Sequence, residues 1–248
     1  MHPEAIAGTA LLLGAWTWAW IRRGQRPDAG RSLALGIGLL AGLAATMGPL
    51  HDLAEHRLFS AHMIQHLLLV LVMPPLLLAA TPSWMIDAVL VPLLRPPLLA
   101  GGVRSLTRPV PALMLHAAAL AVWHLPGPFE RAVASPPWHA TEHVVLVATA
   151  FLAWWPVLSP SRLLPALHYG TQILYLFAFG IPMTAVAVMI TGAEDVLYPF
   201  YAEAARAAGI DALADQRLGG ILMWVPAGVV PLAAFTVAFF RWAAAEAE

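Results

Sequence analysis

Long apolar segments recur along the whole chain, and they constrain the fold more than any other feature of the sequence. The length of each segment is close to the length of about 20 residues that a helix needs to cross the hydrocarbon core of a membrane. Charged residues make up only 11% of the 248 residues, which is about half of the usual fraction in soluble proteins. We therefore predict an all-α, polytopic membrane helix bundle that forms one integral membrane domain over residues 1–248. The segments predict about seven transmembrane helices, at residues 5–21, 33–50, 62–80, 109–125, 141–158, 170–191 and 218–240.

Prolines and flanking charges refine this prediction. The first apolar segment is followed by arginines, whereas a signal peptide carries its positive charge before the apolar region, so we expect a retained helix. Pro74 and Pro75 in the third segment and Pro182 in the sixth predict kinks or breaks. Residues 84–100 are apolar but are interrupted by prolines, and we interpret them as an interfacial or re-entrant piece.

The distribution of arginine predicts the orientation. The chain has no lysine, and nine of its 13 basic residues lie in the first, third and fifth loops and near the C-terminus. Because loops rich in Lys and Arg remain in the cytoplasm, we predict an N-terminus outside and a C-terminus in the cytoplasm. The net charge of −1 gives no support for a nucleic-acid partner.

Most of the histidines gather on the predicted outer side. Eight of the ten fall in outer loops or at outer helix ends: His2, His51, His56, His62, His66, His124, His139 and His143. The pairs His62/His66 and His139/His143 have a spacing of four residues, which places both imidazoles of each pair on one helix face. Two such pairs at the same membrane level predict a metal ion held between helices.

The residue types limit which metal this site prefers. The chain contains no cysteine, so the ligands must be His, Met, Asp or Glu. Met73, Met183 and Met223 lie below the predicted outer surface, and imidazole together with thioether favours copper, whereas imidazole alone also suits zinc. Methionine in an apolar helix also serves as packing, and interfacial histidines also serve as hydrogen-bonding residues. His116 lies near the middle of the fourth segment, where a polar side chain is costly and tends to be functional.

Two further patterns leave alternatives open. The segment HATEH at residues 139–143 matches the H-x-x-E-H pattern of a zinc-peptidase class, in which Glu142 would act as the general base. Glu142 would otherwise orient an imidazole or act as a helix-start acid. Asp215 and Gln216 open the last segment, where Asp215 either caps its own helix or faces the histidines.

Four ordered segments together resemble one family, the CtaG-type cytochrome c oxidase assembly factors. The segments are SAHMIQHLLLVLVMPPLLLAATP (60–82), VWHLPGPFERAV (122–133), HATEHVVLVATAFLAWWPVL (139–158) and LADQRLGGILMWVP (213–226). The motif residues are His62, Met63, Gln65, His66, His124, His139, Glu142, His143, Asp215, Gln216 and Trp224. The resemblance implies a multi-pass protein of the bacterial cytoplasmic membrane that helps to mature the copper-containing caa3-type oxidase. Its implied partners are oxidase subunits, membrane lipid and an extracytoplasmic copper donor.

These observations favour an assembly factor or metallochaperone over an enzyme. The expected copper ligands are His62, His66, His124, His139, His143 and Asp215. The expected supporting residues are Glu142, His116, Met63, Met73, Met223 and Gln216. The alternatives are an intramembrane zinc-dependent hydrolase, a b-type haem protein with His66 and His143 as axial ligands, and a metal-free assembly scaffold.

Overall fold

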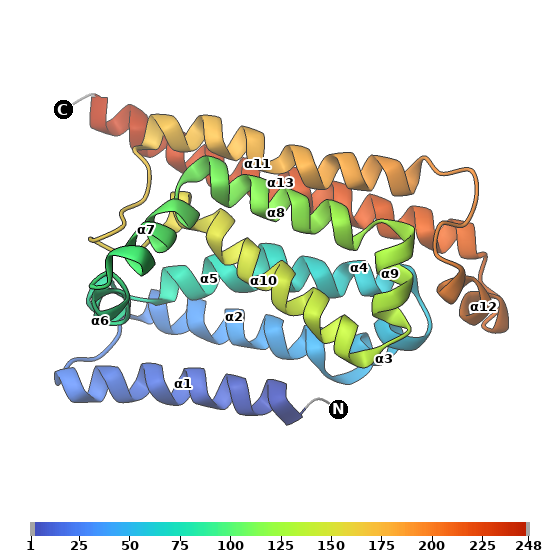
Figure 1. The fold of residues 1–248 in the computed structure, drawn as a ribbon, viewed down its shortest axis with the longest axis horizontal. Coiled ribbons are helices and arrows are strands. Elements are labelled where there is room, and N and C mark those ends of the chain that lie inside the picture. The colour runs from blue at the N-terminus through green and yellow to red at the C-terminus, as the bar shows by residue number, and fades with distance from the viewer. Residues whose placement is uncertain (1–2, 247–248) are drawn as a thin grey trace.

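The computed structural model describes residues 3–246, and these residues form a bundle of helices without a β-strand (Figure 1). The longer helices run roughly along one axis, and short helices lie at the two ends of the bundle. The elements are α1 (Pro3–Arg23), α2 (Ala29–Thr46), α3 (Gly48–His56), α4 (Phe59–Leu67), the π-helical turn η1 (Leu68–Val72), α5 (Met73–Ala80), α6 (Ser83–Leu93), α7 (Pro97–Leu106), α8 (Pro109–Trp123), α9 (Pro126–Val133), α10 (Pro136–Leu158), α11 (Tyr169–Thr191), α12 (Pro199–Ala207) and α13 (Ala212–Glu246).

Several of these helices can cross a membrane by length and composition. Within residues 3–246 they are Ala29–His56, Phe59–Ala80, Pro136–Leu158, Tyr169–Thr191 and Ala212–Glu246. The number rises from five to six if α7 and α8, which meet at an angle of 71°, form one broken span. The predicted all-α, multi-pass architecture is confirmed. The count of seven stays a prediction, because α1 is not among these spans and α8 joins them only together with α7.

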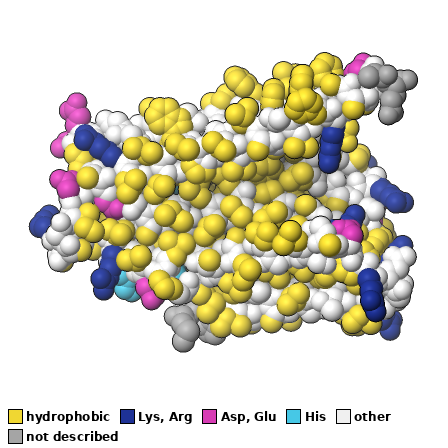
Figure 2. Space-filling model, turned by 180° about the vertical axis from the view of Figure 1, so that it is seen from behind, with side chains coloured by type: hydrophobic (Ala, Val, Ile, Leu, Met, Phe, Trp, Pro, Cys, Tyr) yellow, Lys and Arg dark blue, Asp and Glu magenta, His cyan; other side chains and the backbone are white. Residues whose placement is uncertain are grey.

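The surface of the bundle matches a membrane environment. Apolar side chains cover the middle of the face seen in Figure 2, and charged side chains gather toward the ends of that face. Large apolar side chains are well exposed in the middle of the helices, such as Leu40 (65%), Leu174 (73%) and Phe177 (75%). In a lipid bilayer such residues face acyl chains, so their exposure carries no hydrophobic cost.

The two ends of the bundle differ in composition. One end carries α3, α9 and α12, and we call it the histidine end because α4 and α10 begin there with their histidines (Figure 1). The opposite end carries α6, α7, the α1–α2 connection and the C-terminal part of α13, and we call it the arginine end. The nine arginines of the first, third and fifth loops and the C-terminus lie on elements of this end.

The third apolar segment remains helical through its prolines, but its regular α-helical hydrogen bonding is interrupted just before them. Pro74 has no N–H to donate to the carbonyl of Val70, the partner that a regular α-helix would use. The five residues before α5 form the π-helical turn η1, and the indole Nε1 of Trp154 donates to the Val70 carbonyl at 3.0 Å. A side chain of α10 therefore replaces the missing backbone donor. In contrast, α11 continues as one helix through Pro182.

Small residues allow the closest helix contacts, as is usual between helices in a membrane. In α2, a Cβ added at Gly42 would meet Met73 Sδ of α5 at 2.8 Å. In α13, a Cβ at Gly219 would meet Phe59 Cδ1 of α4 at 2.4 Å, and one at Gly220 would meet the backbone nitrogen of Thr191 at 2.9 Å. The last helix therefore packs tightly on both α4 and α11, which fixes where α4 presents its histidines.

Candidate metal centre

Histidines from two helices and one helix end meet inside the histidine end of the bundle. The helix α4 contributes His62 and His66, whose ring centroids lie 4.3 Å apart. From α10 come His139 and His143, with centroids 4.1 Å apart. His124 follows the last residue of α8, and its ring lies 5.5 Å from that of His66. The helix spacing therefore brings each pair together, and the packing of α10 against η1 and α5, which continue α4, brings the two pairs together.

Four of these side chains offer ligand atoms to one point. One atom each from His62, His66, Glu142 and His143 lies within 4.8 Å of the other three. An ideal tetrahedral site with metal–ligand distances of about 2.0–2.1 Å has ligand atoms about 3.4 Å apart. The four ligand atoms would therefore have to approach one another to hold an ion in this geometry. The first three of these residues are buried, and His143 is half-buried.

A tyrosine of α12 fixes the tautomer of His62. The hydroxyl of Tyr201 donates to the carbonyl of Ala54, and its oxygen lies 2.9 Å from Nδ1 of His62. Burial raises the pKa of the Tyr201 hydroxyl well above its usual value, and the nearby Glu55 carboxylate raises it further, so the hydroxyl keeps its proton. Because the single hydroxyl proton goes to a carbonyl, His62 must donate from Nδ1. Its Nε2 therefore carries the lone pair that a metal ion requires.

The buried atoms of His66 and Glu142 lack ordinary hydrogen-bond partners. Within residues 3–246, neither ring nitrogen of His66 and neither carboxylate oxygen of Glu142 makes a hydrogen bond. The contact between His66 Nε2 and Glu142 Oε1 is 3.7 Å long, and the Glu142 side chain is fully buried. Leaving such groups unpartnered costs free energy. A bound cation at this point would satisfy the imidazole and the carboxylate at once.

His139 and His124 lie beside this set rather than within it. Nδ1 of His139 lies 2.6 Å from Glu55 Oε1, and its Nε2 lies 3.9 Å from Glu142 Oε2. His124 donates from Nδ1 to the Leu120 carbonyl at 2.8 Å, so its Nε2 carries a lone pair. Both imidazoles are therefore held by an acceptor on one nitrogen and turn the other toward the interior of the bundle.

Asp215 and Gln216 hold other helices instead of joining the histidines. The Asp215 carboxylate accepts from the backbone nitrogens of Phe59, at 2.7 Å, and Ser60, at 3.4 Å, and also from the Ser60 hydroxyl. It thereby caps the N-terminus of α4, which belongs to a distant part of the chain. Gln216 Oε1 accepts from the Leu197 backbone nitrogen at 2.7 Å. Asp215 thus supports the candidate site through the position of α4.

His116 and the methionines that the sequence predicts as supporting residues are not among the four ligand-bearing side chains. His116 donates from Nδ1 to Thr149 Oγ1 at 3.1 Å, since the threonine hydroxyl itself donates to the Val145 carbonyl. The sulfur of Met73 lies against Gly42 of α2. Met63 packs against Gly219 of α13. Met183 and Met223 belong to the main apolar core.

The remaining outer histidines divide by exposure. His51 is buried and lies 3.3 Å from Gln65 Nε2 and 3.6 Å from Glu55 Oε1, whereas His56 is exposed. His2 lies outside the described residues.

Sequence reasoning did not identify Tyr201 and Glu55 as partners of the cluster. Tyr201 belongs to α12, a nine-residue helix in an outer loop, and its spacing from His62 in the chain carries no signal. Glu55 follows His51 by four residues, which indicates a shared helix face but not its contact with His139. The sequence analysis predicts Glu142 as a supporting residue, whereas in the structure it is one of the four ligand-bearing side chains.

Comparisons with known proteins identify the family. No curated protein and no solved structure matched the chain. The sequence model of one family, described as cytochrome c oxidase caa3 assembly factor, matches residues 11–245, which is nearly the whole chain and includes every residue of the candidate metal centre. The match confirms the resemblance that the four sequence segments indicated and supports a role in the assembly of cytochrome c oxidase. The chain therefore belongs to the cytochrome c oxidase caa3 assembly factor family, Caa3_CtaG.

Proposed function

We propose that this protein binds a copper ion through His62, His66, His143 and Glu142 and delivers it to cytochrome c oxidase during assembly. The observation that carries the proposal is the convergence of these four ligand atoms within 4.8 Å in a buried site. Three imidazoles and one carboxylate suit copper or zinc, and divalent copper binds such ligands more tightly than zinc does. The oxidase that the family serves contains copper, which makes copper the expected cargo.

The absence of thiolate supports transfer rather than storage. The chain contains no cysteine, so the site lacks the soft anionic ligand that holds copper most firmly in proteins. A copper ion held by imidazole and carboxylate is therefore more easily exchanged with a site on an oxidase subunit. We expect the histidine end to lie on the extracytoplasmic side of the bacterial cytoplasmic membrane, where a copper donor would load it.

The zinc-hydrolase alternative assigns a different role to Glu142. A general base must act on a metal-bound water and therefore remains outside the ligand set. In this chain one Glu142 oxygen belongs to the group of four ligand atoms, which favours the role of a ligand. The two assignments make opposite predictions for Glu142→Gln, because loss of a ligand weakens metal binding whereas loss of a base leaves it intact.

The experiment is metal analysis of the purified protein and its variants. The protein is stripped with a chelator in detergent, loaded with copper or zinc, desalted, and measured by elemental mass spectrometry. We expect about one copper per chain in the wild type and a loss of most of it in a His62→Ala/His66→Ala variant. The matched control is His56→Ala, because His56 is an exposed histidine at the same end of the bundle and should leave copper binding unchanged.

Other outcomes would contradict the proposal. Equal copper binding in the double variant would place the metal elsewhere. A stoichiometric preference for zinc, with hydrolysis lost in Glu142→Gln, would support the hydrolase, and a visible haem band would support a haem protein. A wild type that binds no metal but still promotes oxidase assembly would support the alternative of a metal-free assembly scaffold. In cells that express the oxidase, the proposal also requires less copper in the oxidase when the double variant replaces the wild type.

A further inference from the structure

A second feature of the molecule, far from the histidines, is a large groove between α1 and the rest of the bundle. Its volume is about 1160 Å³, somewhat larger than the roughly 300–1,000 Å³ of typical small-molecule pockets. Side chains of α1 line one wall, including Trp16 and Trp18, and side chains of α6 and α10 line other parts, including Trp84 and Phe151. The lining residues of α1 run from Leu12 to Arg23, where the helix ends.

The packing of α1 explains why this groove exists. The helix joins the bundle through a small apolar cluster of its own, in which Trp16 packs near Leu35, Leu39 and Ala80. The indole Nε1 of Trp16 also donates to the Ala80 carbonyl at 3.2 Å. This cluster is separate from the main core. The contact holds α1 at one side and leaves the space beside α6 and α10 unfilled by protein.

The charged side chains that line the groove are both cationic and lie next to each other. Arg22 and Arg23 are the charged residues of the lining, which contains no aspartate or glutamate. The Arg23 guanidinium lies 4.7 Å from the ring centroid of Trp84, and that of Arg22 lies 5.4 Å from Trp18. Among residues 3–246, neither arginine pairs with a carboxylate. The apolar groove therefore ends in two neighbouring cations that are not neutralised by the described part of the protein.

We propose that this groove binds an anionic phospholipid, with its acyl chains along the apolar walls and its phosphate on Arg22 and Arg23. The guanidinium group binds phosphate through two parallel hydrogen bonds. Tryptophan and arginine are also the residues that anchor helices at the headgroup level of a bilayer. Basic residues at the end of an apolar membrane helix attract anionic lipids, and Arg22 and Arg23 lie in the last turn of α1.

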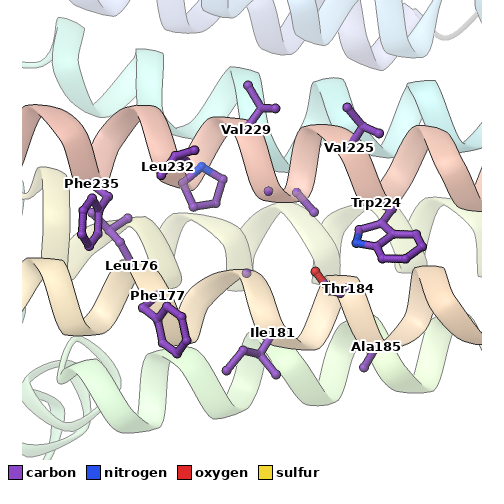
Figure 3. A pocket seen from close by; sticks show the side chains of 14 residues that line it. Leu176, Phe177, Ile181, Thr184, Ala185, Trp224, Val225, Val229, Leu232 and Phe235 are labelled. Atoms are coloured by element: carbon purple, nitrogen blue, oxygen red, sulfur yellow. The ribbon is translucent and has the colours of Figure 1, made fainter.

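A second apolar groove provides an internal comparison. It lies between α11 and α13, has a volume of about 820 Å³, and is lined by apolar residues and Thr184, without a charged side chain (Figure 3). Acyl chains can cover this surface as well, but nothing in its lining selects a headgroup. The difference between the two grooves predicts that the lipid bound beside α1 is selected by charge, whereas lipid beside α11 and α13 is exchanged without preference.

The test measures lipid retention by the full-length protein purified in mild detergent. Native mass spectrometry is carried out after addition of dioleoyl phosphatidylglycerol or dioleoyl phosphatidylcholine at equal concentrations. We expect the wild type to retain one phosphatidylglycerol in preference to phosphatidylcholine, with a rise in the thermal unfolding midpoint. Arg22→Gln/Arg23→Gln should lower this retention about tenfold or more. Arg26→Gln is the matched control, since Arg26 is exposed at the same end of the bundle but does not line the groove.

A second variant fills the groove without changing its charge. Ala148 lines the groove from α10 and is exposed, so Ala148→Trp should exclude the lipid while leaving the helix contacts intact. The proposal is overturned if the double arginine variant retains phosphatidylglycerol as the wild type does, or if the wild type shows no preference between the two lipids. Copper binding by the same preparations reports independently on the histidine end.

Discussion

At the scale of single residues, three buried histidines share one arrangement. His62, His116 and His124 each use Nδ1 to donate to an oxygen, of Tyr201, Thr149 and Leu120 respectively. Each therefore presents Nε2 as a lone pair. Partners of this kind fix the tautomer and orientation of metal-binding histidines in known sites. The residue types and spacings of the site were readable from the sequence, but Tyr201 and Thr149 were not readable as partners, because they come from distant parts of the chain.

The hydroxyl of Tyr201 yields a prediction at this scale. Tyr201→Phe removes the acceptor that holds Nδ1–H of His62, so the imidazole can rotate or change tautomer. We expect copper affinity to fall about 10–100-fold, the usual effect of losing such a partner, as measured by competition with a chromophoric chelator.

Tyr198→Phe is the matched control for this prediction. Tyr198 belongs to the same outer loop, is equally buried, and donates to the backbone carbonyl of His124 at 2.8 Å. Tyr198→Phe loses one buried hydrogen bond and Tyr201→Phe loses two, so each costs about 1 kcal/mol or more of stability, but only Tyr201→Phe should weaken copper binding. An equal loss of affinity in the two variants would show that the effect comes from stability alone.

At the scale of the helices, hydropathy and periodicity predicted most of the long elements and the two histidine pairs. A continuous α-helix with its regular repeat would carry Met73 on the same face as His66, seven residues earlier. The π-helical turn at Leu68–Val72 changes the helical repeat at that point, and the Met73 sulfur faces Gly42 of α2. The short helices α3, α9 and α12 were not predicted, since short amphipathic segments in loops give no hydropathy signal.

The packing of α13 yields a prediction for two glycines of one helix. In Gly220→Ala, the new Cβ would lie 2.9 Å from the Thr191 backbone nitrogen and 3.1 Å from the Ala187 carbonyl oxygen. Backbone atoms cannot rotate away, so we expect α11 and α13 to separate at a cost of about 1–3 kcal/mol. Thermal unfolding in detergent measures the loss.

Gly228→Ala is the control, because it lies on the same helix with no atom within 4 Å of a new Cβ. Replacing glycine by alanine in a helix should stabilise it by up to about 1 kcal/mol. If both variants unfolded at the same temperature, close packing at Gly220 would not contribute to the stability of the contact between α11 and α13.

At the scale of the whole molecule, composition predicted a multi-pass membrane protein, and the structure separates its charges accordingly. The loops that carry nine arginines lie at the end opposite the histidine cluster. This separation supports the predicted orientation, in which the histidine end faces away from the cytoplasm.

The absence of cysteine allows a direct measurement of orientation. Ala208→Cys places a unique thiol at the exposed end of α12, and Gln25→Cys places one in the exposed α1–α2 connection. We expect a membrane-impermeant maleimide to label Ala208→Cys in intact spheroplasts and to label Gln25→Cys only after permeabilisation. The reverse pattern would place the histidine cluster on the cytoplasmic side and contradict delivery of copper from outside.

The cap that Asp215 provides for α4 also determines when the site can form during synthesis. Phe59 and Ser60 emerge from the ribosome about 155 residues before the carboxylate that binds their backbone nitrogens. The N-terminus of α4 can therefore be capped only after the final helix has been translated and inserted. A nascent chain already carries every imidazole of the cluster before this cap exists, so we expect the cluster to reach its final arrangement only after α13 has been inserted.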